Sequence, residues 1–179
     1  MKQNWQEIFG SWVVATGTFV SAIANTPSIP FTRTLQQDFK VIGNTMQGTG
    51  NALSVQPIYS FTLEDLANEV QSIGNTTIVG SLLLDFNDST KQSLNTKGNL
   101  LQALGGGMAF AKNYQKKLSI RTVYIGFGNL LQMIGNSFQA VSPQLKQIEA
   151  IINTLGNWIQ ALGALMTAIG TTMPGETNH

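Results

Sequence analysis

The residues that could carry acid–base or metal chemistry are few and scattered in this chain. Cysteine is absent, and the one histidine, His179, is the last residue. The closest useful carboxylates, Asp65 and Glu69, lie one helical turn apart without a histidine nearby to complete a metal site. Serine and threonine are frequent, but nucleophilic catalysis normally needs a base beside the hydroxyl group. We therefore expect no catalytic residues, no metal, no cofactor and no enzymatic activity.

Charge is also scarce. Only 11% of the residues are charged, against roughly 25% in an average globular protein, and the net charge is +1. Nucleic-acid binding requires clustered lysine and arginine, so we expect no nucleic-acid partner. A surface with so little charge repels its neighbours weakly, and this favours a homo-oligomer.

A short phrase recurs six times in the chain: a glycine, usually followed by asparagine, with a second small residue seven positions later. The copies are Gly10 with Gly17, Gly43 with Gly50, Gly74 with Ser81, Gly98 with Gly105, Gly128 with Gly135, and Gly156 with Gly163. Four copies carry glutamine four positions after the first glycine, namely Gln47, Gln102, Gln132 and Gln160. Such repetition indicates that one structural unit is used several times.

Apolar residues accompany the phrase with helical spacing. In the last copy they are Leu155, Ile159, Leu162, Met166 and Ile169. Alternating steps of four and three predict a buried seam of the coiled-coil type. At roughly 100° per residue, both small residues lie on one edge of this stripe, the asparagine lies roughly opposite it, and the glutamine lies beside the glycines.

Glycine inside a helix costs about 1 kcal/mol relative to alanine, so its repetition needs a compensating cause. Close approach of a neighbouring helix backbone is the simplest cause. We therefore predict helix-packing or interface roles for Gly10, Gly17, Gly43, Gly50, Gly98, Gly105, Gly128, Gly135, Gly156 and Gly163. Trp12 and Trp158 occupy matching positions, and we expect them to pack at the edge of the core, with a partner surface as the alternative.

Helix start and stop signals complete the fold prediction. Helices are expected at about residues 4–24, 34–55, 62–86, 90–116, 119–141 and 142–170, with Ser142-Pro143 starting the last one. Short connections predict antiparallel neighbours. The expected fold is all-α, a bundle of about six repeated antiparallel helices with glycine-mediated close packing. Residues 1–170 would form a single repetitive domain, and residues 171–179 a flexible C-terminal tail.

Two features keep alternative interpretations open. The repeated asparagine and glutamine could form a neutral polar face, or their amides could bond between neighbouring helices or subunits and fix the register. The run Gly105-Gly106-Gly107 could be a hinge.

Long uncharged stretches raise the question of a membrane. Residues 8–32, between Glu7 and Arg33, and residues 150–175, between Glu149 and Glu176, are long enough to cross a bilayer. The N-terminal stretch also imitates a signal peptide, but it matches the internal repeat, so we expect no cleaved signal. Localisation stays open between the cytoplasm and the cell or spore surface.

The phrase Gly-Asn-x-x-Gln-x-x-Gly resembles that of uncharacterised short Gly-Asn repeat proteins of spore-forming Gram-positive bacteria. The likeness is best over residues 9–23, 128–141 and 155–169, while the third copy departs from it at Ile78 and Ser81. This resemblance implies no activity and no ligand residues.

The sequence thus predicts a non-enzymatic structural or interaction protein that self-associates through repeated helical surfaces. The alternative is a membrane-acting protein, inserting or pore-forming, that uses its uncharged first and last helices. A third hypothesis is a carrier with a cavity for a small apolar ligand between its helices.

Overall fold

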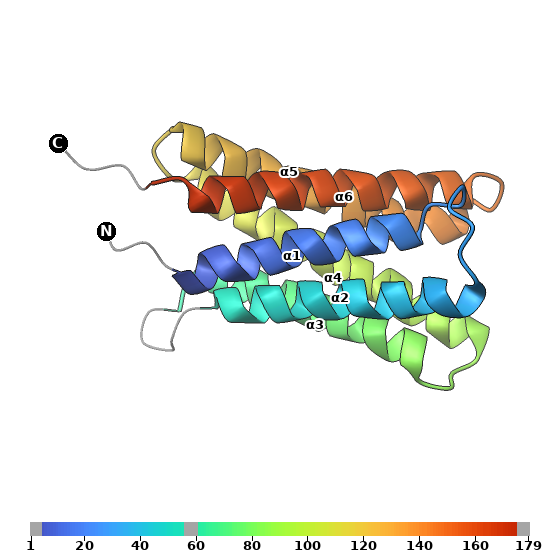
Figure 1. The fold of residues 1–179 in the computed structure, drawn as a ribbon. Helices are drawn as coiled ribbons and strands as arrows, with labels where there is room; N and C mark the ends of the chain where they lie inside the picture. The colour runs from blue at the N-terminus through green and yellow to red at the C-terminus, as the bar shows by residue number, and fades with distance from the viewer. Residues whose placement is uncertain (1–4, 56–60, 175–179) are drawn as a thin grey trace.

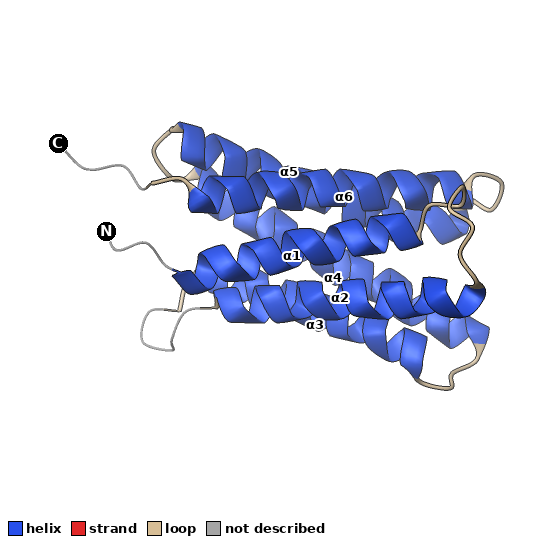
Figure 2. Ribbon diagram, in the orientation of Figure 1, coloured by secondary structure: helices blue, strands red, loops and turns tan. Residues whose placement is uncertain are grey.

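The computed structural model describes residues 5–55 and 61–174, and within them the chain is all-helical (Figures 1 and 2). The helices are α1 (Trp5–Ala24), α2 (Arg33–Ser54), α3 (Leu63–Leu83), α4 (Asp88–Tyr114), α5 (Ile120–Val141) and α6 (Glu149–Thr172), with a short 3₁₀ turn, η2 (Ser142–Gln144), before the last. The described residues contain no strand. The prediction of an all-α protein with six helices is confirmed.

Local sequence signals set several of the helix starts. The backbone nitrogen of Thr62 donates to Asp65 Oδ2 at 2.7 Å, and Thr62 Oγ1 accepts from the Asp65 nitrogen at 3.2 Å, which makes a reciprocal cap for α3. Asn87 Oδ1 accepts from the Thr90 nitrogen at 2.8 Å and caps α4. Ser119 caps α5 in the same reciprocal way. These starts lie close to their predicted positions because a polar side chain satisfies the free backbone donors.

The predicted start of the last helix at Ser142-Pro143 is wrong. The backbone of Ser142 is helical (φ −53°, ψ −40°), and its hydroxyl donates to the Gln139 carbonyl at 3.0 Å. Ser142 therefore lies at the C-terminal end of α5. The residue that caps the N-terminus of a helix has an extended backbone, which Ser142 does not have. The last helix, α6, begins only at Glu149, and its cap residue Ile148 makes no side-chain hydrogen bond.

The last helix extends two residues beyond its predicted end at about residue 170. Helix α6 continues to Thr172, and Thr171 is buried with its hydroxyl 2.7 Å from Ser11 Oγ on α1. The two helix ends are thus joined by a side-chain hydrogen bond. Of the predicted tail, residues 175–179 lie outside the described part of the chain.

The six helices form a closed ring. Each packs against the helices before and after it in the chain, and α6 packs against α1 (Figure 1). Asn25, just beyond α1, donates to Asn157 Oδ1 of α6 at 3.2 Å, near the other end of the seam from Ser11. Every helix therefore has two flanks against neighbours, one face toward the ring axis and one toward the surroundings.

Glycines of one helix face backbone atoms of the other in the pairs α1–α2, α3–α4 and α5–α6. A Cβ atom on Gly10 would sit 2.5 Å from the carbonyl oxygen of Gly50, and a Cβ on Gly50 would sit equally close to the oxygen of Gly10. The same reciprocal contact occurs between Gly17 and Gly43, Gly74 and Gly98, Gly128 and Gly163, and Gly135 and Gly156. Gly105 faces the carbonyl of Ala67 instead, and α4 runs unbroken through Gly105-Gly106-Gly107. The backbones approach so closely that no side chain fits between them.

The apolar stripe faces outward, so the predicted buried seam is wrong. Phe127 and Leu162, which belong to the stripe, are 57% and 53% exposed. The largest fully buried side chains include Asn75 and Asn136. Asn75 follows the first glycine of its phrase, Gly74, and Asn136 follows the second glycine of its phrase, Gly135. The angular relation between asparagine and stripe was predicted correctly, but the asparagine side is the inner one. Glycines on the flanks fix which edges meet neighbours, and this leaves the stripe free to point either inward or outward.

A matched pair of glycine substitutions tests the close contacts. In Gly135→Ala the new methyl would lie 2.5 Å from the Gly156 oxygen and 2.6 Å from the Gln160 nitrogen, so α5 and α6 must separate. We expect the free energy of unfolding to fall by about 1–3 kcal/mol. In Gly80→Ala the methyl meets no atom within 4 Å, and the free energy should rise by up to about 1 kcal/mol. Denaturant melts measure the free energy of unfolding of both variants. Equal changes in Gly135→Ala and Gly80→Ala would contradict a close contact at Gly135.

Candidate functional site

The inner face of the ring is polar. The asparagine and glutamine of the repeated phrase, with equivalent residues, turn their amides toward the axis and are buried. These buried amides are Gln47, Asn51, Gln71, Asn75, Asn99, Gln102, Asn129, Gln132, Asn136, Asn157 and Gln160. Because both an amide nitrogen and an amide oxygen are present in each, these side chains can satisfy one another without any charge.

Three of these glutamines meet at the axis. Gln160 Nε2 donates to Gln47 Oε1 at 2.8 Å and to Gln102 Oε1 at 3.1 Å. They come from α6, α2 and α4, the second helix of each consecutive pair, and from the same position of the phrase. We call Gln47, Gln102 and Gln160 the glutamine layer. It joins helices that are not neighbours in the ring, so these amides act between helices of one chain.

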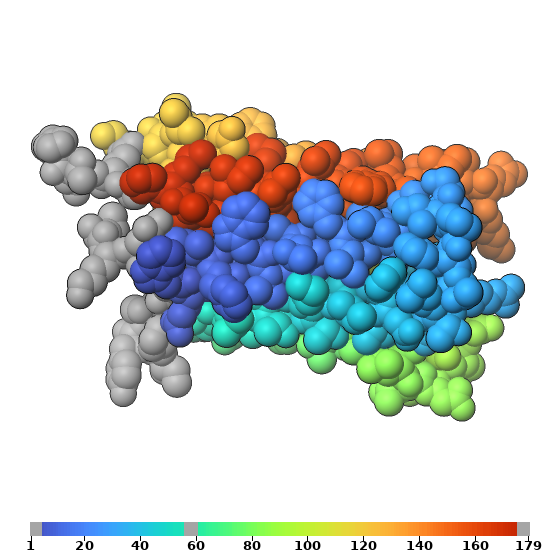
Figure 3. All heavy atoms as spheres, viewed as in Figure 1, coloured from blue at the N-terminus to red at the C-terminus, as the bar shows by residue number. Residues whose placement is uncertain are grey.

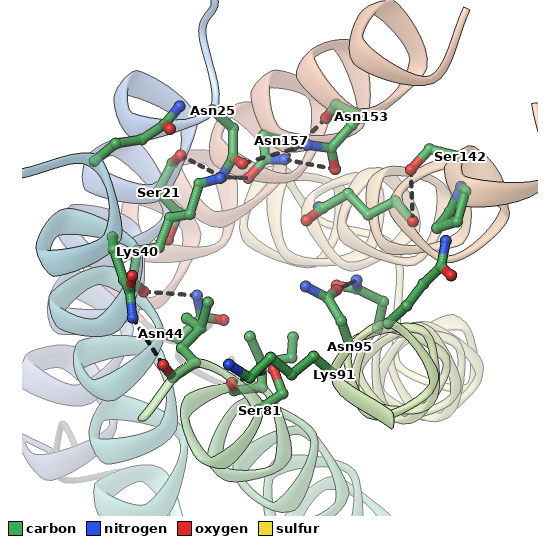
Figure 4. Close-up of a pocket in the computed structure, with 18 of the residues that line it drawn as sticks. Ser21, Asn25, Lys40, Asn44, Ser81, Lys91, Asn95, Ser142, Asn153 and Asn157 are labelled. Atoms are coloured by element: carbon green, nitrogen blue, oxygen red, sulfur yellow. Dashed lines mark hydrogen bonds between the residues drawn. The ribbon is translucent and has the colours of Figure 1, made fainter. Parts of the chain in front are cut away.

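Above the glutamine layer the ring opens into a chamber of about 580 Å³. It lies at the end where α1, α3 and α5 finish and α2, α4 and α6 begin. Side chains from around the ring face a common opening (Figure 4). Among them are Ser21, Asn25, Asn44, Ser81, Asn95, Ser142, Asn153 and Asn157, with the glutamine layer as the floor. Nearly all of the lining offers hydrogen bonds.

Charged residues in the chamber are mostly cationic. Arg33 and Lys40 of α2 and Lys91 of α4 line it, together with a single carboxylate, Glu149 of α6. Burial lowers the pKa of Lys40 below its usual range, because the ammonium group loses water. In the described part of the chain no ion pair joins Glu149 to any of these cations.

Several buried amides keep an unused atom. Asn99 Nδ2 donates to Asn95 Oδ1 at 2.7 Å, but Asn99 Oδ1 has no partner among the described residues, although the residue is only 3% exposed. Asn75 Oδ1 and both side-chain polar atoms of Asn136 are in the same condition. Such atoms normally find a partner, because burying one without a partner costs free energy.

A second, much smaller cavity of about 50 Å³ lies toward the opposite end. Its lining includes Asn51 and Ala164, one helical turn beyond the glutamine layer on α2 and α6, and Glu7. Burial and repulsion from Glu64 raise the pKa of Glu7, while Arg121, whose Nη2 lies 3.9 Å from Glu7 Oε1, opposes the rise. The two cavities therefore lie on either side of the glutamine layer.

The residues predicted as packing sites lie outside the lumen, by which we mean the polar interior of the ring with its two cavities. The ten glycines occupy helix–helix contacts on the flanks of the helices. Trp12 Nε1 donates to Thr172 Oγ1 and Trp158 Nε1 to Thr26 Oγ1, both at 3.0 Å, so the tryptophans tie α1 to α6 near its two ends. The sequence singled out the repeated amides and left bonding between helices open as an alternative, but it did not predict that they line the interior of the ring, although amides recurring opposite the apolar stripe were a usable signal.

The chamber offers hydrogen bonding and charge attraction. Among the described residues, no group of three or more histidine, cysteine, aspartate or glutamate side chains is placed to hold a metal ion. The chamber combines amides, hydroxyls and cations. Hydrogen bonding and charge attraction are the chemistry that this set of side chains offers.

Replacing one member of the glutamine layer tests its role. Gln160→Met keeps a similar shape but leaves Gln47 Oε1 and Gln102 Oε1 without their shared donor, so we expect the free energy of unfolding to fall by about 1–3 kcal/mol. Methionine at all three positions removes the unpaired acceptors and should restore part of the loss. The exposed Gln92→Met serves as the control, with a change within about 0.5 kcal/mol. Denaturant melts in which the triple variant is the least stable would contradict this account.

Comparison with known proteins adds one result. No curated protein and no solved structure matches the chain. The sequence model of DUF6944, a family of unknown function, matches residues 5–168, from the start of α1 into the last turns of α6. The chain therefore belongs to this family of unknown function.

Proposed function

We propose that the protein is a non-enzymatic helical bundle that works by burying its apolar outer surface in a lipid bilayer. The observation that carries this proposal is the reversed polarity of the ring, with amides inside and the apolar stripes outside. In a bilayer, polar side chains of a helical bundle face the interior or a water-filled cavity, and the lipid contacts apolar side chains.

Exposure of the outer surface to water is unfavourable in free energy. More than twenty large apolar side chains are exposed, and they occur on every helix. Each buried apolar side chain is worth about 1.5–3 kcal/mol relative to an exposed one. Contiguous apolar patches beyond a few hundred Å² mark interaction surfaces in soluble proteins. A hydrophobic surrounding removes this cost on all sides of the ring, whereas a single protein partner covers only one side.

Helix length fits a bilayer. The helices run from 20 to 27 residues, or about 30–40 Å at 1.5 Å per residue, and the hydrocarbon core is about 30 Å thick. Among the described helices, only α1 is apolar enough as a whole to pass as a membrane span. Mean hydropathy counts the lumen side as well as the outer side, so it undervalues helices whose polar half faces the axis.

The adjacent helices α5, α6 and α1 form the side best suited to lipid. Residues 122–141, 150–172 and 8–24 of these helices contain no charged residue. Their outward side chains include Phe9, Phe127, Leu155 and Leu162. Figure 3 shows α1 and α6 as one continuous surface on the face in view. We call this surface the α5–α6–α1 face.

Close helix packing supports the same proposal. In our interpretation the molecule is three antiparallel hairpins of one repeated unit, α1–α2, α3–α4 and α5–α6. In α1–α2 and α5–α6 the numbers of the facing glycines rise along one helix and fall along the other, and in α3–α4 the contacts Ala67–Gly105 and Gly74–Gly98 follow the same order. Small residues at helix contacts are typical of membrane bundles, where packing and hydrogen bonding replace the hydrophobic drive.

Self-association is the second candidate function. Glu69 of α3 and Lys97 of α4 are exposed on the opposite side of the ring, where charges are unfavourable in hydrocarbon. This asymmetry favours a one-sided contact in which two copies meet through their α5–α6–α1 faces. Such a contact between like surfaces gives a closed dimer.

Liposome flotation tests the bilayer proposal. We expect the purified chain to float with vesicles, and Leu162→Lys on the α5–α6–α1 face to weaken binding at least tenfold, because lysine in the bilayer centre costs about 3 kcal/mol. Leu104→Lys is the matched control, since this α4 residue is 56% exposed and Leu162 is 53% exposed. Equal losses would mean immersion on all sides, and a smaller loss for Leu104→Lys would mean one-sided contact. A chain that stays at the bottom of the gradient contradicts the proposal.

Sedimentation velocity with and without detergent tests the second candidate. A dimer in buffer that Leu162→Lys converts to a monomer, and that Leu104→Lys leaves intact, is the expected result for contact through the α5–α6–α1 face. A monomer at micromolar concentration in buffer would exclude self-association.

A further inference from the structure

We propose that the chamber above the glutamine layer is a binding site for a small anion that also carries hydroxyl groups, such as the phosphate ester of a polyol. This inference does not depend on the proposed function, because the chamber lies inside the ring whatever surrounds the outer surface.

The size of the chamber suits a small metabolite. Its volume of about 580 Å³ falls within the range of roughly 300–1,000 Å³ typical of ligand pockets. The glutamine layer closes it below, and the labelled side chains in Figure 4 surround its opening from α1, α2, α3, α4, η2 and α6. A ligand entering from this end of the bundle therefore meets side chains on all sides.

The charge of the lining selects an anion. Arg33, Lys40 and Lys91 outnumber Glu149, and no ion pair within the described residues neutralises them. An arginine guanidinium binds phosphate or carboxylate through two parallel hydrogen bonds, and lysine adds a point charge. The lowered pKa of Lys40 shows that its ammonium group is short of water, so a bound anion would stabilise it.

The neutral groups of the lining suit hydroxyls. Amides from Asn44, Asn95 and Asn153 supply both donors and acceptors at the wall. Asn99 is one of the lining residues, and its buried Oδ1 accepts no hydrogen bond from the described residues, which leaves this atom available to a hydroxyl of a ligand that enters beside it. Few lining residues are apolar (Ile78, Leu82 and Pro143), and an apolar ligand would leave the amides unpaired.

Titration calorimetry on the full chain, in detergent if the protein requires it, tests the site. The probes are glycerol 3-phosphate, inorganic phosphate and glycerol. We expect glycerol 3-phosphate to bind most tightly, phosphate more weakly, and glycerol at least tenfold more weakly than glycerol 3-phosphate. Binding of glycerol as tight as that of its phosphate ester, or no binding of either anion at millimolar concentration, would overturn the proposal.

Two substitutions on the same helix separate the site from general charge effects. Lys91→Gln removes a chamber cation and should weaken binding of glycerol 3-phosphate about tenfold, whereas Lys97→Gln removes an exposed cation of α4 and should leave it unchanged. Asn99→Ala should weaken binding of glycerol 3-phosphate more than that of inorganic phosphate, because only the former carries alcohol hydroxyls. Equal losses from Lys91→Gln and Lys97→Gln would contradict a site in the chamber. The melting temperature of each free variant shows whether it is folded.

A lipid head group carries the same chemistry as a free polyol phosphate. Micelles containing phosphatidylglycerol distinguish the two sources in a competition with glycerol 3-phosphate. Displacement of glycerol 3-phosphate that Lys91→Gln weakens would assign the site to a lipid head group, and the absence of displacement would assign it to a soluble anion.

Discussion

Glycine pairs let the backbones of paired helices approach one another closely. At five glycine pairs, the carbonyl oxygen of one helix lies 2.5–2.8 Å from where the facing glycine would carry a Cβ atom. At these points a Cβ atom in place of either glycine hydrogen would clash with the facing helix. Buried amides gather on the inner face, and most of the large exposed apolar side chains lie on the outer face.

A polar interior gives the ring a different kind of core from the apolar core that is usual in helical bundles. Amides crossing the axis, as Gln160 does to Gln47 and Gln102, hold helices in register through directional bonds rather than through packed volume. They also leave space, because hydrogen-bonding side chains fill a ring less completely than interlocking aliphatic ones. The chamber and its unpaired Asn99 oxygen are consequences of the same choice of residues.

Most of the helices could be predicted from the amino-acid sequence, but the face of each helix that points to the ring axis could not. Caps at Thr62, Asn87 and Ser119 are local, so helix starts could be predicted, while the false start at Ser142 arose because a serine before proline can also end a helix. Inward and outward faces could not be distinguished, because helical periodicity separates the two faces of a helix without showing which one points to the ring axis. The chamber was beyond reach for another reason. Arg33, Lys91 and Glu149 come from separate helix starts, and only ring closure brings those starts to one end.

Closure between α1 and α6 makes the order of helices along the chain identical to their order around the ring. Ser11 and Thr171 lie in hydrogen-bond contact, so the first and last helices meet as any other neighbours do. No helix is therefore set apart by its neighbours as the first or the last of the ring. A circularly permuted chain, with α1 and α6 joined by a linker and a break in any other connection, would keep every pair of neighbours and the same axis.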